Sequence, residues 1–146
     1  MFSEKEILSV VEMLKNENLD VRTVTLGLNL LDCASDDIGR FTDNIYARIT
    51  AAARHLVEVC DDVGDKYGIP VVNKRISVSP MAVAAAPFDA EQMVAIARTL
   101  NEAAAAARVD FIGGFSALVE KGLARGDRAL IEAVPAALTE TERVCA

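Results

Sequence analysis

The feature that most constrains the fold is the alternation of short, apolar, β-branched segments with long helical ones. The strand-like segments are residues 21–31, 71–79 and 109–112. Because a long helical stretch separates each strand from the next, the strands are expected to run parallel and to be joined by right-handed crossovers. The sequence therefore predicts an α/β fold in which residues 1–146 form a single unit around a small three-stranded sheet.

Capping residues and apolar spacing locate the helices. Ser3 and Glu6 form a capping-box pattern at the start of a helix over residues 3–16. Ser35 is the expected N-cap of a helix of about eight turns that Gly68 ends. Asp89 and Gln92 start the next helix, and further helical pieces are expected over 116–121 and 127–143, the second bent or split near Pro135. Apolar residues recur with helical spacing in the first three of these helices. They are Ile7, Val10, Val11 and Leu14 in the first; Ile38, Phe41, Ile45, Ile49, Ala52, Leu56, Val59, Val63 and Tyr67 in the second; and Met93, Ile96, Leu100, Ala103 and Ala107 in the third.

Composition excludes several classes of function. The net charge is −7, the aromatic content is 5% and tryptophan is absent, so the clustered bases and stacking platforms of a nucleic-acid binder are missing. The acidic N-terminus is unlike a signal peptide, and no apolar run reaches the length of a membrane span. Cys33, Cys60 and Cys145 lack the spacing of a zinc site or a disulfide framework. We expect a reduced cytoplasmic protein that contacts neither nucleic acid nor membrane and holds no metal.

Successive side chains of a strand point to opposite faces, so the first and second predicted strands each have an apolar face and a polar face. The polar face of the first strand carries Thr23, Thr25, Gly27 and Asn29, and that of the second carries Asn73, Arg75, Ser77 and Ser79. Since parallel sheets are normally apolar on both faces, the polar face needs an explanation. One interpretation is a lumen or cleft in which Arg75 binds an anionic ligand. The other is a face covered by solvent or by a second subunit.

Two further features have competing explanations, and the remaining candidates have one each. Gly113-Gly114 followed by Ser116 can present backbone N–H groups to an anion, although close packing also explains paired glycines. Cys33 lies beside Asp32 near the end of the first strand, where it is a candidate reactive thiol or a buried structural one. His55 is expected at the surface, which leaves no histidine for a catalytic triad. Glu140 and Glu142 are expected to form a solvated helix face, and Cys60 and Cys145 to have packing roles.

Four segments suggest a family: VRTVTLGLNLLDCAS (21–35), YGIPVVNKRISVSP (67–80), VDFIGGFSALVEKG (109–122) and PAALTETERVC (135–145). Together they resemble the uncharacterised pyruvate formate-lyase-like proteins of bacteria and archaea, over the N-terminal portion of the family's usual length. The resemblance implies an α/β barrel like that of glycyl radical enzymes and no assigned activity. Radical chemistry does not follow, because Cys33 matches no cysteine motif and a glycine loop is not expected within this portion.

These observations leave three hypotheses. The first is the N-terminal part of an enzyme-like barrel that binds a small anionic metabolite. In it Arg75 holds the anion, Asn29, Asn73, Ser77 and Ser79 orient it, and Gly113, Gly114 and Ser116 anchor a second edge. The second is a non-catalytic regulatory or assembly module that forms homo-oligomers. The third is a truncated chain that needs a C-terminal partner segment to cover its sheet edges. Reaction, substrate and cofactor are not specified.

Overall fold

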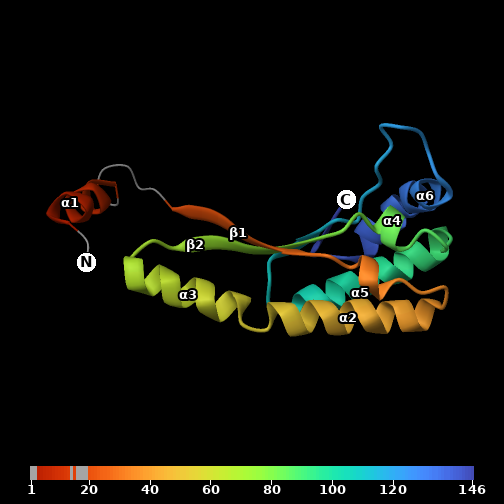
Figure 1. Cartoon of the computed structure of the whole chain (residues 1–146), viewed down its shortest axis with the longest axis horizontal. Helices are drawn as coiled ribbons and strands as arrows, with labels where there is room; N and C mark the ends of the chain where they lie inside the picture. The colour runs from red at the N-terminus through yellow and green to blue at the C-terminus, as the bar shows by residue number, and fades with distance from the viewer. Residues whose placement is uncertain (1–2, 14, 16–19) are drawn as a thin grey trace.

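A computed structural model describes residues 3–13, 15 and 20–146 of the 146-residue chain. It confirms the α/β class: a four-stranded sheet in the order β1-β2-β3-β4, every neighbouring pair parallel, with helices between the strands (Figure 1). The strands are β1 (Val21–Leu28), β2 (Val71–Val78), β3 (Phe111–Gly113) and β4 (Val144–Cys145). The helices are α1 (Glu4–Glu12), η2 (Leu31–Cys33), α2 (Ile38–Ala53), α3 (Leu56–Tyr67), α4 (Met81–Ala84), α5 (Ala90–Ala106) and α6 (Arg125–Glu140).

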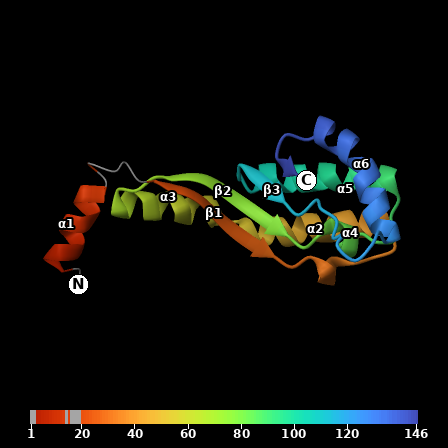
Figure 2. The ribbon, with the colours of Figure 1, turned by 90° about the horizontal axis from the view of Figure 1, so that it is seen from above.

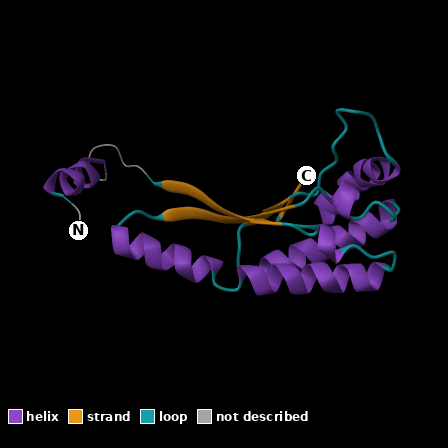
Figure 3. Ribbon diagram, viewed as in Figure 1, coloured by secondary structure: helices purple, strands orange, loops and turns teal. Residues whose placement is uncertain are grey.

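The helices α2, α3 and α5 lie on one side of the sheet (Figures 1 and 3). Most of the sheet residues that face them are apolar, because this is where burial can drive folding. Lys74 is an exception, and its Nζ pairs with Asp61 Oδ1 of α3 (2.9 Å). Along one row of the ladder the facing residues are Leu26, Ile76, Ile112 and Val144. The core beneath them is completed by fully buried side chains from the helices and loops, including Phe41 and Phe88, whose ring centroids are 5.3 Å apart.

The expected eight-turn helix is two helices, and that prediction was wrong. α2 ends at Ala53 and α3 begins at Leu56, with His55 at φ −113° and ψ 5° between them. The two halves have different partners, because α2 packs against α5 whereas α3 packs against β2. The buried stripe shifts accordingly: Ala53 and Cys60 are buried, whereas Ala52 and Val59 are exposed. Apolar spacing continues through the break, so periodicity alone could not reveal it.

The C-terminal third also differs from expectation. The segment expected as a helix over 116–121 is an irregular loop, and α6 starts only at Arg125. Pro135 lies inside α6, which runs from Arg125 to Glu140 without a split at the proline. Helix α6 ends at Glu140, Thr141 is extended, and the chain bends at residues 142–143 before it forms β4, a fourth strand that the sequence did not predict. The chain is turned by Asn101 on α5, whose Oδ1 accepts hydrogen bonds from the backbone N–H groups of Glu142 (3.1 Å) and Arg143 (3.0 Å).

The N-terminal helix stands apart from the sheet (Figures 1 and 2). Its capping box is confirmed: the Ser3 backbone N–H and hydroxyl donate to Glu6 Oε2 (2.7 and 2.8 Å), and Ser3 Oγ accepts from the Glu6 N–H (3.3 Å). The bond from the Ser3 backbone N–H is the main cause that lowers the pKa of Glu6. The expected apolar face is exposed at Ile7, Val10 and Val11, and its fourth member, Leu14, lies outside the described residues.

Candidate functional site

The face of the sheet turned away from α2, α3 and α5 is called here the open face, and two adjacent rows of residues cross its centre. The strand register places Thr25 beside Arg75 and Arg75 beside Phe111. Two residues further along each strand lies a second row, and in parallel strands residues opposite each other share a face. That row is Gly27, Ser77, Gly113 and Cys145. All but Gly113, which is half-buried, are exposed in the part of the chain that the structure describes.

Arg75 lies over the ring of Phe111, with its Cζ atom 5.3 Å from the ring centroid. A guanidinium over an aromatic face is held by electrostatic attraction to the ring, which restricts its rotamers without using its N–H donors. Among the described residues Arg75 makes no salt bridge. Its N–H fork is therefore available to a carboxylate or phosphate. Phe111, which the sequence analysis did not select, is thus a neighbour of the principal candidate residue.

Asn29 and Ser79 meet at the carboxyl ends of β1 and β2, where they bond to each other. The Ser79 hydroxyl donates to Asn29 Oδ1 (3.0 Å) and accepts from the backbone N–H of Leu30 (3.1 Å). Asn29 Oδ1 also accepts from the N–H of Leu31 (2.9 Å). These bonds shape the turn into η2, so the two side chains have a structural use whether or not a ligand is bound.

Asn73 lies toward the other end of β2 from Ser79. Six residues separate the two, which corresponds to about 20 Å along a strand. The Asn73 amide donates to the backbone carbonyl of Arg22 on β1 (3.0 Å) and ties the two strands together there. Asn73 and Ser77 each lie two residues from Arg75 on the same face of β2, whereas Asn29 and Ser79 meet separately at the carboxyl ends of the strands. Asn73 is therefore near Arg75 but distant from the Asn29–Ser79 pair.

The Gly113-Gly114-Ser116 segment bonds to α4 through its carbonyl groups. The Gly114 carbonyl accepts from the N–H of Met81 (2.9 Å), and the Ser116 carbonyl accepts from the N–H of Ala82 (3.3 Å). Gly114 has φ +114°, and a Cβ there would lie 2.4 Å from the Val78 carbonyl oxygen. Close packing therefore explains Gly114. Because no helix follows directly, the helix dipole expected to support an anion at this turn is absent from it.

Cys33 is buried, and Asn44 donates to its backbone carbonyl (3.3 Å). Burial is the main cause that raises the pKa of the Cys33 thiol, and the neighbouring Asp32 carboxylate adds to it. Both effects disfavour the thiolate, the form that a nucleophile requires. Burial also raises the pKa of Cys60. By contrast, Cys145 is exposed on the open face, a position that the sequence could have suggested only by recognising β4.

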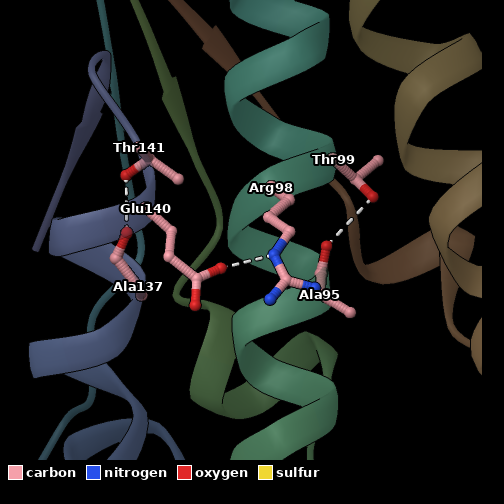
Figure 4. Close-up of polar contacts among 6 residues, drawn as sticks. All are labelled: Ala95, Arg98, Thr99, Ala137, Glu140 and Thr141. Carbon is pink, nitrogen blue, oxygen red and sulfur yellow. Dashed lines mark hydrogen bonds and ion pairs between the residues drawn. The ribbon is translucent and has the colours of Figure 1, made fainter.

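The remaining candidates lie elsewhere. His55 is exposed and pairs with Glu58, its Nδ1 3.0 Å from the carboxylate. Glu140 accepts a bond from Arg98 Nε (2.5 Å), which links α6 to α5 through two partly exposed side chains (Figure 4). The bond raises the pKa of Arg98. Within the described ranges no group of three or more His, Cys, Asp or Glu side chains is placed to hold a metal ion. None of the described helices is both long enough and apolar enough to cross a membrane.

Comparison with known proteins gives consistent matches. Residues 12–146 match the family described as Uncharacterised ACR (DUF711). A UPF0210 protein of Desulfovibrio desulfuricans is 64% identical over 145 residues, which cover 99% of this chain and 32% of that protein. UPF0210 proteins of Methanosarcina barkeri (53% over 141 residues, 97% and 31% of the two chains) and Streptococcus equi subsp. equi (49% over 142 residues, 97% and 32%) are similar too. The chain spans about a third of the length of these relatives.

These matches correct the expected resemblance in part. They agree with an uncharacterised family whose members are longer than this chain. Neither the family description nor the names of the relatives link the chain to pyruvate formate-lyase or to glycyl radical enzymes. The parallel sheet agrees with the α/β class that the resemblance implied.

Proposed function

This chain belongs to the Uncharacterised ACR (DUF711) family, and on that premise we propose that it forms one side of a larger α/β barrel that encloses a small anionic metabolite against the open face. The observation that carries the proposal is the asymmetry of the sheet. One face is mainly apolar and covered by helices, and its Lys74 is paired with Asp61, whereas the other carries Arg75, without a salt bridge among the described residues, beside hydroxyl groups. A parallel sheet normally has both faces covered, and about two thirds of the length of the relatives lies outside the region that this chain matches and could cover this face.

In the proposed site Arg75 binds the anion as a bidentate donor while Phe111 limits its motion. Ser77 is the neighbouring hydroxyl on the same face and lies next to Gly113 in the ladder. Asn29 and Ser79 shape the carboxyl end of the strands, where α/β proteins bind ligands. Asn73, Gly114 and Ser116 complete the candidate set as residues that hold strands and turns in place. Arg75 and its neighbouring hydroxyl group support binding of an anion, and no reaction is part of the proposal.

The test uses a family-length chimera, in which this chain replaces the matching N-terminal third of the Desulfovibrio desulfuricans relative. Thermal unfolding is followed with inorganic phosphate, acetate and succinate. A ligand present at 100 times its Kd stabilises the folded state by about 2.7 kcal/mol. We expect at least one of these anions to raise the Tm, Arg75→Ala to abolish the rise, and Arg22→Ala to preserve it, since Arg22 is an exposed arginine on the opposite face of the sheet.

The proposal fails if none of the anions raises the Tm of the chimera, or if Arg75→Ala responds as the parent does. Arg75→Lys separates charge from geometry. Lysine keeps the charge but loses the planar fork, so we expect an intermediate response.

An assembly role is the second candidate, favoured by the exposed apolar side chains of α1. Ile7 and Leu8 are 52% and 67% exposed, and α1 has no buried residue. Light scattering on the chimera distinguishes the two functions. A stable oligomer that Ile7→Asp dissociates, together with no response to anions, favours assembly. A monomer that responds to an anion favours the binding function.

A further inference from the structure

Two glycines of the open face have no local explanation. Gly27 and Gly113 lie within strands, neither has a positive φ, and a Cβ built on either would meet nothing within 4 Å. Gly114 and Gly126 differ, because a Cβ there would collide with backbone carbonyl oxygens at 2.4 and 2.3 Å. Glycine weakens a strand by its flexibility and often marks a place where another backbone approaches closely. Within the described chain, nothing approaches Gly27 or Gly113.

The two glycines belong to one row that crosses all four strands. Gly27 lies beside Ser77, Ser77 beside Gly113, and Gly113 beside Cys145. With four strands about 4.8 Å apart, the row is about 14 Å long. Arg75 and Phe111 stand on one side of it, and Asn29 and Ser79 follow on the other. The row is therefore a low strip, bounded by larger side chains, that runs across the strands.

We propose that an extended polypeptide segment from the remaining two thirds of the family-length chain lies across this strip. The relatives contain enough further polypeptide for such a segment, since this sequence covers only 32% of the Desulfovibrio desulfuricans protein. The strip suits an extended polypeptide backbone better than a small ligand, because it is long. It extends beyond β2, the strand that carries Arg75, as far as the edge strand β4. The docking of this segment does not require a bound anion. The segment would lie beside the row of Thr25, Arg75 and Phe111 and cover the proposed anion site without filling it.

The test compares each substitution in two settings, the 146-residue chain and the family-length chimera. In the 146-residue chain, Gly27→Val and Gly113→Val point into open space and favour the strand, so their Tm is unchanged or raised. In the chimera each is expected to collide with the docked segment and to lower the Tm by about 5 °C or more. Thr25→Val is the matched control, because it lies on the same strand and face as Gly27 but outside the strip. It should behave alike in both settings.

Cys145 provides a second, independent measurement. Its thiol is exposed in the 146-residue chain and is expected to react rapidly with a disulfide reagent at a concentration where the chain is monomeric. In the chimera we expect the docked segment to slow this reaction at least about tenfold, since a covered thiol reacts only when the cover opens. Cys33 and Cys60 are buried in the 146-residue chain and give the slow reference.

Equal effects of the glycine substitutions in both settings, or equal reactivity of Cys145, would overturn the proposal. Protection that depends on chimera concentration would also overturn it, because a second copy would then cover the strip. Gly27→Ala and Gly113→Ala repeat the comparison with a smaller side chain where a valine variant does not fold. No anion is added, so a failure here is distinct from a failure of the Arg75 experiment.

Discussion

Gly113 and Gly114 are neighbours in sequence with different structural roles. Gly114 has a positive φ and lies so close to β2 that a Cβ would be 2.4 Å from the Val78 carbonyl oxygen. Gly113 has neither constraint. The sequence predicted the pair as a turn at the end of a strand but could not separate the two roles, because the contact with Val78 joins positions far apart in the chain.

We predict that Gly114→Ala lowers the free energy of unfolding of the 146-residue chain by about 2–4 kcal/mol. Strained backbone and overpacking each contribute on the order of 1–3 kcal/mol. Gly113→Ala is the control and should change it by less than about 1 kcal/mol. Urea unfolding of both variants measures the difference, and equal stability of the two would show that β2 can move away from Gly114.

For the candidate site residues, too, the sequence predicted local placement but not contacts between distant positions. Alternation correctly placed Arg75 and Ser77 on one face of β2, since the period of a strand fixes side-chain direction. Asn29 and Ser79 were placed on that face too, but their mutual hydrogen bond joins residues 50 positions apart. The contact of Phe111 with Arg75 depends on the register between β2 and β3, which no local pattern encodes.

Helix starts are the elements that the sequence predicted best, because a cap is a local interaction. The capping boxes at Ser3 and at Asp89 are both present. The start of α2 is the exception: its N-cap is Asp37, whose Oδ1 accepts from the N–H of Arg40 (2.7 Å). Ser35, the expected cap, instead accepts a hydrogen bond from the N–H of Asp37 (3.1 Å) and so precedes the helix.

The adjacent residues Asp36 and Asp37 allow a matched test of this cap. We predict that Asp37→Ala reduces the free energy of unfolding by about 1 kcal/mol, since it leaves the Arg40 N–H without its acceptor. Asp36→Ala removes the same charge next to the same helix but no hydrogen bond, so its effect should stay within about 0.5 kcal/mol. Chemical denaturation followed by circular dichroism gives both values. A larger effect at Asp36 would contradict the assignment.

Elements that depend on distant partners were predicted less well. The break at His55 follows from the separate packing of α2 and α3, and β4 follows from a turn held by Asn101. Both lie in segments whose local spacing is typical of a continuous helix. Periodicity therefore predicted whether a segment is a strand or a helix. The division of one helix into two and the number of strands depend on tertiary contacts, which periodicity does not contain.

For the whole molecule, the principal feature is an incompletely covered sheet. Within the described residues β1 pairs only with β2, so one edge of an eight-residue strand has unpaired backbone groups. Unpaired edges of this length promote association between chains. The relatives, three times as long, have further polypeptide to cover them. This is why the fold class could be predicted from these residues but closure of a barrel remains a proposal.

We predict that the 146-residue chain associates as its concentration rises and that the family-length chimera does so much less. Light scattering coupled to size exclusion, over a range from about 1 μM to about 1 mM, measures this. Charge repulsion at a net charge of −7 opposes association, so added salt should increase it. A cooperative monomer at all concentrations would contradict the prediction and indicate that the exposed edge is self-protecting.

The turn held by Asn101 has a consequence for the order of folding. The last strand is two residues long, too short to nucleate by itself, and its approach is fixed by an amide on a helix about 40 residues earlier. Arg143 adds a second anchor by donating to the carbonyl of Val109 (2.7 Å). The two acceptors, Asn101 Oδ1 and the Val109 carbonyl oxygen, are in position only after α5 has docked and β3 has begun to form. We therefore expect β4 to join the sheet late in folding and to be the first strand to detach in native-state hydrogen exchange.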